Sequence, residues 1–279
     1  MPELGFNPYL AFGWCVLAGF LMSSGAGGGG ILAGIGHITI LGIGDPNMIK
    51  VVNQILEFSS RIVSVPLYHR QRRLVWSLAA AFGLGAPLGA VAGSWFSKSY
   101  LSDLVLYRAV FGLIVAGVGA RVLWEGWRQG TRRAPAVHEH PRTIAYGWRA
   151  VRVRFGAEHF DFNPWSAALG GFCISFVGSM LGVGGGFLVT PFMASLLLFP
   201  AYLAVGTGLL ALMIPLTVSV LTYLALEVGV DWKLVAVEVP GVLAGSFLGP
   251  ALNRYMNEKA LKMFVAVVLL AIGLYYVVK

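Results

Sequence analysis

Two glycine runs, each inside a long apolar segment, constrain this chain more than any other feature. The first run is Gly25-Ala26-Gly27-Gly28-Gly29-Gly30, and the second is Gly182-Val183-Gly184-Gly185-Gly186. Glycine is a poor helix former and adopts positive φ freely, so such a run predicts a helix that stops, turns and restarts. A broken helix at membrane depth leaves backbone polar groups unpaired, which is tolerated only against protein or a water-filled cavity.

The composition indicates that these breaks lie in a membrane. Of the 279 residues, 57% are hydrophobic and 11% are charged, whereas soluble domains average about 25% charged residues. The chain is therefore predicted to be a polytopic integral membrane protein. Its net charge of +8 reports loop topology rather than nucleic-acid binding. Residues 1–9 lack a basic n-region, so we expect no cleavable signal peptide.

The apolar segments predict an all-α fold of two homologous halves, with membrane repeats at 1–127 and 164–279. Each half has a glycine-broken helix or re-entrant hairpin followed by three transmembrane helices. The first apolar block, 9–43, would be roughly 50 Å long as a helix, too long for one crossing of about 30 Å and short for two. The expected helices after the two blocks span 47–68, 74–96, 104–127, 201–226, 233–252 and 260–278.

Matching features in the two halves indicate an internal duplication. Gly241 to Ser246 repeats the spacing of Gly89 to Ser94, and this small-residue spacing predicts close helix packing. Cys15 and Cys173 precede their glycine runs at nearly the same distance and are expected to be buried free thiols.

Basic residues predict that the two halves are inverted. Arg70, Arg72 and Arg73 follow the second helix of the first half, whereas Arg254 and Lys259 follow the third of the second half. Basic loops face the cytoplasm, so the basic polar linker at 128–163 would be cytoplasmic too. That linker is either a solvated loop or an interfacial segment against anionic headgroups. The alternative topology has eight full crossings and parallel halves.

The motifs of the chain resemble those of the TauE/SafE family. They are the paired glycine runs, the extension Phe187-Leu-Val-Thr-Pro191, and the segments Ala204-Val-Gly-Thr207-Gly and Val230-Asp231-Trp232. The resemblance implies a permease of a prokaryotic inner membrane that exports sulfite, sulfoacetate or related organosulfur anions. The first half departs from the pattern, because Lys50 to Asn53 stands where the second half has Thr207 onwards, which places Lys50 at the position of Thr207.

One face of the helix at 47–68 carries the strongest candidates for substrate binding. Lys50, Asn53, Gln54, Glu57 and Arg61 follow the helical i, i+3/i+4, i+7 spacing. Ionisable residues inside a membrane cost several kcal/mol unless they are paired or hydrated. A guanidinium fork suits two oxygens of an oxyanion. The structural alternatives are a Glu57–Arg61 pair along the helix and a Lys50 that reaches the interface.

The glycine breaks could also bind the anion through the helix N-termini that follow them. The alternative is that these glycines only allow tight helix packing. The candidate substrate-binding residues are Gly25, Gly27, Gly28, Gly29, Lys50, Asn53, Glu57, Arg61, Gly182, Gly184, Gly185, Gly186 and Thr207.

Glu238 and His37 are separate candidates for proton coupling. Glu238 lies inside a predicted helix, and His37, in the arm after the first break, titrates near neutral pH. The alternatives are an interfacial carboxylate and a core histidine with satisfied hydrogen bonds. We expect no metal site and no cofactor, and take His138-Glu139-His140 to be part of a solvated loop.

These observations favour a secondary transporter that exports small sulfur-containing anions by alternating access. The alternative is a passive channel or permease for small anions or neutral solutes. An enzyme is not expected, because no nucleophile–base pair or metal cluster is evident at membrane depth, and no P-loop supports a primary pump. The expected partners are a small anion and the lipid bilayer, without nucleic acid.

Overall fold

The computed structural model describes residues 6–25, 28–128 and 139–253, together with isolated residues between 263 and 275. Gly27, Arg254 and Lys259 and most of the helix expected at 260–278 lie outside the described residues. The helices of the first half are α1 (Pro8–Ser24), α2 (Gly29–Ile35), η1 (Gly36–Ile40), α3 (Pro46–Arg70), α4 (Trp76–Tyr100) and α5 (Leu104–Arg128). The second half contains α6 (Pro164–Leu181), α7 (Gly186–Pro191), η2 (Phe192–Leu196), α8 (Ala201–Ala211), α9 (Met213–Ala225) and α10 (Trp232–Asn253).

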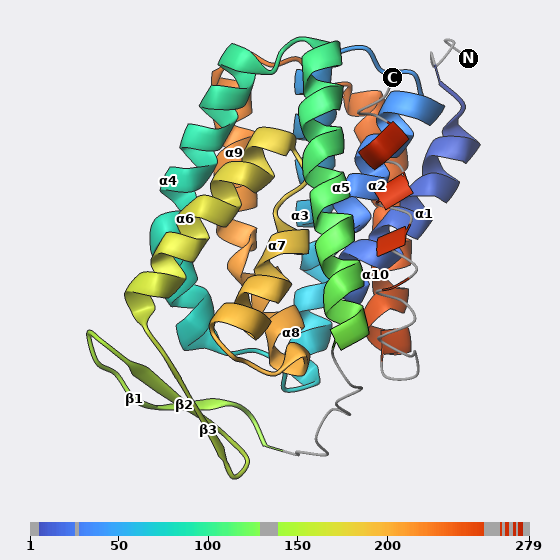
Figure 1. Cartoon of the computed structure of the whole chain (residues 1–279). Helices are drawn as coiled ribbons and strands as arrows, with labels where there is room; N and C mark the ends of the chain where they lie inside the picture. Colours follow the sequence, from blue (N-terminus) through green and yellow to red (C-terminus); the bar gives the residue numbers. More distant parts are fainter. Residues whose placement is uncertain are drawn as a thin grey trace.

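The model confirms the prediction of a helical membrane protein. Five of the described helical spans are long and apolar enough to cross a bilayer. They lie at 76–100, 104–121, 164–181, 201–225 and 232–251. Helix α3 is as long as α4 but less apolar, because it carries the predicted row of polar side chains. It lies in the middle of the bundle, with α1, α2 and α10 on one side and α4, α6 and α9 on the other (Figure 1).

Each glycine-broken block is a hairpin that returns to the side from which it entered. We call α1 to η1 the first hairpin and α6 to η2 the second hairpin. Phe6, before α1, packs in one apolar cluster with Leu41 and Ile43, which follow η1. Phe162, before α6, contacts Phe199, which follows η2, with ring centroids 5.8 Å apart. Of the two topologies considered, this geometry matches the hairpins.

The two hairpins begin in the same way but at opposite ends of the bundle. Asn7 and Asn163 cap α1 and α6 by accepting backbone N–H hydrogen bonds, and a proline follows each in the first turn. Helix α1 begins at the end of the bundle away from the sheet, whereas α6 begins directly after β3, beside the sheet (Figure 1).

The predicted small-residue packing joins one half to the other. A Cβ at Gly85, Gly89 or Gly93 of α4 would collide with the backbone of α6. Likewise, a Cβ at Gly241 or Gly245 of α10 would collide with the backbone of α1. The two backbones are therefore in contact along each pair, as in small-xxx-small membrane interfaces. The first helix of each hairpin therefore packs against a long helix of the other half, α1 against α10 and α6 against α4.

The described part of the linker, 139–163, contains a sheet that neither predicted alternative, a solvated loop or an interfacial segment, included. The sheet is antiparallel, in the order β1 (Arg142–Ala145), β2 (Val151–Phe155) and β3 (Glu158–Phe162). Along β2, buried Val151, Val153 and Phe155 alternate with exposed arginines, which is the period of a half-buried strand. The buried face packs on the apolar cluster that includes Phe199. Each strand has only 4 or 5 residues, so the alternation extends over few positions of the sequence.

The helix expected at 201–226 forms one apolar span at 201–225. A turn at Leu212 divides it into α8 and α9, because Pro215 cannot donate the backbone hydrogen bond that would continue α8 into α9. The expectation of two buried thiols is wrong for Cys173. Cys173 is exposed on α6, whereas Cys15 is buried against α10. The two thiols thus occupy different environments despite their similar distances from the breaks.

Candidate functional site

Both glycine breaks face one carboxylate, that of Glu57 on α3. A Cβ atom at Gly30 in the first break, or at Gly184 in the second, would collide with the side-chain oxygens of Glu57. The same Cβ at Gly30 would lie 3.1 Å from the carbonyl oxygen of Val183 in the second break. The two breaks therefore meet at Glu57, and only glycine leaves room for this side chain.

Arg61, one turn further along α3, forms an ion pair with Glu57. Its Nη1 also donates a 2.7 Å hydrogen bond to the backbone carbonyl of Glu57. The two side chains are only 1% and 3% exposed. Desolvation costs several kcal/mol per ion, so a buried pair of this kind is weak evidence for stability and instead suggests a function.

Asn53 and Gln54 each connect α3 to one break. The Asn53 amide donates to the carbonyl of Gly30, and the Gln54 amide donates to the carbonyl of Ser179, both at 3.4 Å. Within the described residues, the oxygens of both amides, Arg61 Nε and the Ser175 hydroxyl are buried without a hydrogen-bond partner. Buried polar atoms normally have one, so these groups are available to a solute or to water.

Lys50 is fully buried, and its side chain extends toward the start of α3 and the α4–α5 connection. Its Nζ donates to the carbonyl of Leu101 at 2.7 Å and to Asn47 Oδ1 at 3.2 Å. It also lies 4.7 Å from the ring centroid of Tyr107. Gly182 of the second break packs on the Cα and Cβ of Lys50, so the base of this side chain lies against that break.

The other candidate glycines shape the turns themselves. Gly25 and Gly182 end α1 and α6 in the left-handed conformation, with φ of 78° and 71°. Gly185 also has a positive φ of 74°, and a Cβ at Gly186 would lie 3.4 Å from Arg61 Nη2. Gly28 precedes α2, and Gly29 packs against the backbone of Met22.

Thr207 lies away from this cluster. Its hydroxyl accepts a 3.0 Å hydrogen bond from the backbone N–H of Val75 and donates to the Arg73 carbonyl at 3.5 Å. Both partners are in the connection between α3 and α4. A substrate role for Thr207 therefore depends on the family motif and not on a described contact with the breaks.

The alignment of Lys50 with Thr207 is also wrong. Gly182 packs on Lys50 and its counterpart Gly25 packs on Val205, so Val205 is the structural equivalent of Lys50. The connection after η1 (41–45) is one residue longer than that after η2 (197–200), and this shifts the register of the following helix. Tyr68 and Tyr223 support this alignment, because they are 155 positions apart, as are Lys50 and Val205. Each tyrosine donates to the carbonyl of an equivalent serine, Tyr68 to Ser23 at 2.8 Å and Tyr223 to Ser179 at 2.9 Å.

The two proton candidates form a pair, which the sequence did not predict. His37 Nε2 lies 3.0 Å from each carboxylate oxygen of Glu238, and both side chains are 1% exposed. His37 lies in the π-helical turn η1, and Glu238 lies in α10, so the pair joins the first hairpin to the second half. The 201 residues between them explain why spacing alone could not reveal it.

The model for the family described as "Sulfite exporter TauE/SafE" matches residues 11–276. This chain belongs to the TauE/SafE family. Like other TauE/SafE proteins it is a membrane transporter, and its relatives are bacterial, which indicates the inner membrane. No solved structure gives a significant match.

Two TauE/SafE relatives illustrate the range of similarity. "Probable membrane transporter protein YunE" of Bacillus subtilis is 34% identical over 209 residues, 74% of this chain and 71% of the relative. A "Probable membrane transporter protein" of Xylella fastidiosa is 26% identical over 265 residues, 94% of this chain and 91% of the relative. The similarity thus extends over both halves and both glycine breaks.

Proposed function

We propose that this TauE/SafE protein exports small sulfur-containing oxyanions, such as sulfite or sulfoacetate, by alternating access around the two glycine breaks. The observation that carries the proposal is the buried Glu57–Arg61 pair at the point where both breaks meet. A guanidinium fork binds an oxyanion through two parallel N–H donors, as it binds a carboxylate. The side chain that now pairs with Arg61 is itself such a carboxylate.

In this proposal Glu57 takes the place of the substrate in the empty transporter. An arriving oxyanion would replace the Glu57 carboxylate on Arg61, and the unpaired Arg61 Nε and Ser175 hydroxyl would supply further donors. Lys50 adds a second positive charge on α3, two turns from Glu57 and three turns from Arg61. With Glu57 ionised, these three side chains together carry one net positive charge, which favours a small anion over a neutral solute.

We also propose that the halves, 1–127 and 164–279, are inverted repeats whose sheet-bearing end faces the cytoplasm. Arg70, Arg72 and Arg73 follow α3, and the next helix contacts the sheet through a 2.8 Å hydrogen bond between Ser77 and Thr143. Basic residues of the first half and of the linker therefore gather at one end, as cytoplasmic loops do.

Flux in proteoliposomes tests the function. Purified protein would be screened by thermal shift against sulfite, sulfate, thiosulfate, taurine and sulfoacetate, and the stabilising anions then followed as labelled solutes. We expect saturable flux that Arg61→Ala abolishes, whereas Arg152→Ala, an exposed arginine of the sheet, leaves it unchanged. Saturable flux in both variants would remove Arg61 from the substrate site. Flux that does not saturate and ignores a pH gradient would favour a passive permease.

A further inference from the structure

The His37–Glu238 pair has no counterpart in the second half. Helices α4 and α10 begin at Trp76 and Trp232, and η1 and η2 begin at Gly36 and Phe192, in both cases 156 positions apart. The residues equivalent to Glu238 and His37 are therefore Phe82 and Met193, which are both fully buried in one apolar cluster. Between η2 and α4 these positions are therefore occupied by apolar side chains, Met193 and Phe82. Between η1 and α10 they are occupied by two ionisable side chains, His37 and Glu238.

Because the apolar version holds the second hairpin in place, the fold does not require the ionisable version. Replacing a buried ion pair by well-packed apolar residues is often neutral or stabilising. A buried His–Glu pair in a membrane protein is therefore retained for a reason other than stability.

The orientation of the imidazole leaves one nitrogen free to accept a proton. Nε2 faces the carboxylate of Glu238, and with that carboxylate ionised Nε2 carries the hydrogen of the contact. In the neutral ring Nδ1 is then the acceptor, and it is buried without a hydrogen-bond partner among the described residues. A proton that binds Nδ1 would create an imidazolium stabilised by the carboxylate 3.0 Å away.

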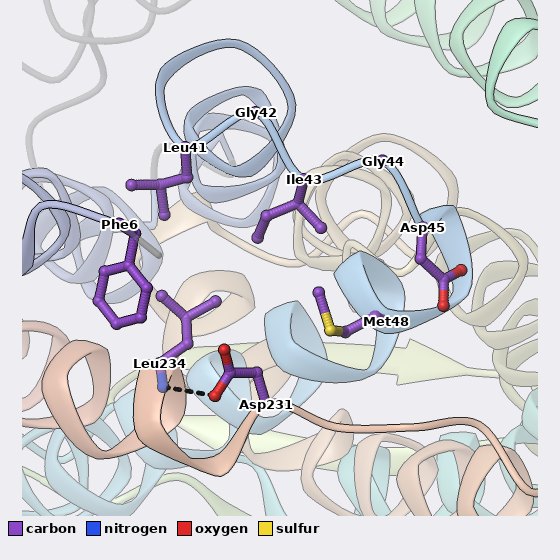
Figure 2. Close-up of a pocket in the computed structure, with 9 residues that line it drawn as sticks. All are labelled: Phe6, Leu41, Gly42, Ile43, Gly44, Asp45, Met48, Asp231 and Leu234. Carbon is purple, nitrogen blue, oxygen red and sulfur yellow. Dashed lines mark hydrogen bonds between the residues drawn. The ribbon is translucent and has the colours of Figure 1, made fainter. Parts of the chain in front are cut away.

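A pocket of about 280 Å³ lies one helical turn above this pair. Leu41 lies four residues after His37, where the first hairpin ends. Leu234 lies four residues before Glu238 on α10. Both leucines line the pocket, where Phe6, Leu41 and Leu234 face one another (Figure 2). Four helical residues rise about 6 Å, so the floor of the pocket lies close to the pair.

Two carboxylates and two lysines lie at or near the pocket. Asp45 and Asp231 line it, Lys50 interacts with Asp45, and Lys233 is in the first turn of α10. At the pair itself, the thiol of Cys15 on α1 lies against Glu238. The pocket is at the first-hairpin entry, the end of the bundle away from the sheet (Figure 1).

We infer that His37 and Glu238 form one proton-binding site that is reached from the non-cytoplasmic end and couples inward proton movement to anion export. The inference rests on the proposed function and names its coupling ion. One proton binds Nδ1 from the outer pocket and leaves toward the cytoplasm when the first hairpin shifts against α10. An inside-negative membrane potential drives protons inward and anions outward, so both movements are downhill with this polarity.

The test compares proton movement with sulfite movement in the same proteoliposomes. A trapped pH-sensitive dye reports protons, labelled sulfite reports the anion, and protein-free vesicles give the passive leak. The main variant combines His37→Met with Glu238→Phe, which copies the apolar joint of the second half and should fold. Glu238→Gln alone tests the carboxylate, and Met193→Leu in the second half is the matched control.

The wild type and Met193→Leu should move protons in a fixed ratio to sulfite. In the double variant and in Glu238→Gln we expect sulfite–sulfite exchange to persist and sulfite-linked proton movement to fall at least tenfold. Unchanged proton movement per sulfite in either variant overturns the proton site and leaves the proposed function intact. Absence of sulfite flux in the wild type would instead overturn the proposed function, and this inference with it.

Discussion

Helix α3 and its counterpart, the pair α8 and α9, occupy equivalent places in the two halves but carry different side chains. With the 155-position register fixed by Tyr68 and Tyr223, Glu57 corresponds to Leu212 and Arg61 to Leu216. A Cβ at Gly184 would touch Leu216 as well as Glu57, so both helices meet at the same break. The two halves therefore share this arrangement of helices, but only α3 carries ionisable side chains at the breaks.

The same division holds at the joint between hairpin and long helix, where His37 and Glu238 correspond to Met193 and Phe82. The lesson is that the repeated architecture needs glycines, helix caps and apolar packing, whereas the ionisable residues are additions to it. Variants that make the first half resemble the second should therefore fold and lose function, and each of the following predictions tests that contrast.

The largest effect is expected from breaking the buried ion pair. Arg61→Leu alone leaves the Glu57 carboxylate buried and unpaired, which costs about 3–5 kcal/mol. Glu57→Leu together with Arg61→Leu copies the second half, so the unfolding temperature should return close to that of the wild type while anion flux stays abolished. Thermal unfolding and flux of both purified variants provide the check. A double variant less stable than Arg61→Leu would contradict the contrast.

Closing the first break should have the next largest effect. Gly30→Ala places a methyl group against the Glu57 carboxylate, and overpacking of this kind costs about 1–3 kcal/mol. Flux should fall with stability. Gly117→Ala on α5 is the control, because a Cβ there meets nothing within 4 Å. Equal behaviour of the two variants would mean that the break is not packed on Glu57.

Removing the second positive charge should weaken anion binding without unfolding the protein. Lys50→Val copies Val205, its structural equivalent. One charge about 16 Å from Arg61 along α3 is worth roughly 1 kcal/mol at an effective dielectric constant near 20, or about fivefold in Kd. Titration calorimetry with sulfite measures this change, and an unaltered Kd would assign Lys50 to structure through its bond to Leu101.

The two tyrosines test the symmetry of the scaffold directly. Tyr68→Phe and Tyr223→Phe each remove one buried hydrogen bond to the end of a hairpin arm and leave a carbonyl without that donor. Each should cost about 1 kcal/mol. The two losses, measured by thermal unfolding, should be similar. A loss confined to one tyrosine would show that the halves are supported differently.

The smallest effect on stability is expected from a change in the sheet, which lies in the linker and belongs to neither half. Arg152 donates a hydrogen bond to Asp161 and keeps the pKa of that carboxyl below its usual range. The stabilisation from this pair is therefore complete above the ordinary aspartate pKa and is lost only as the pH falls below it. Asp161→Asn should behave like the wild type in unfolding scans from pH 5 to 8. A difference that grows within that window would contradict this exposed, solvent-screened role.

Sequence reasoning reached the parts of the fold that are encoded locally. Glycine spacing, the Asn-Pro helix starts and the polar row on α3 were all visible in short windows. The pairing of His37 with Glu238 was not, because it depends on how two halves dock. The sheet was not predictable in the same way, because its strands have only 4 or 5 residues. The register of α8 differs from the expected one because the connection before α8 is one residue shorter than that before α3.

The glycine contacts of α4 with α6 and of α10 with α1 mean that neither half encloses its own hairpin. A single repeat synthesised alone would expose the strip of backbone that its hairpin presents to the missing long helix. In the proposed inverted duplication, a protein of half the present length would therefore need these helices from a second copy in opposite orientation.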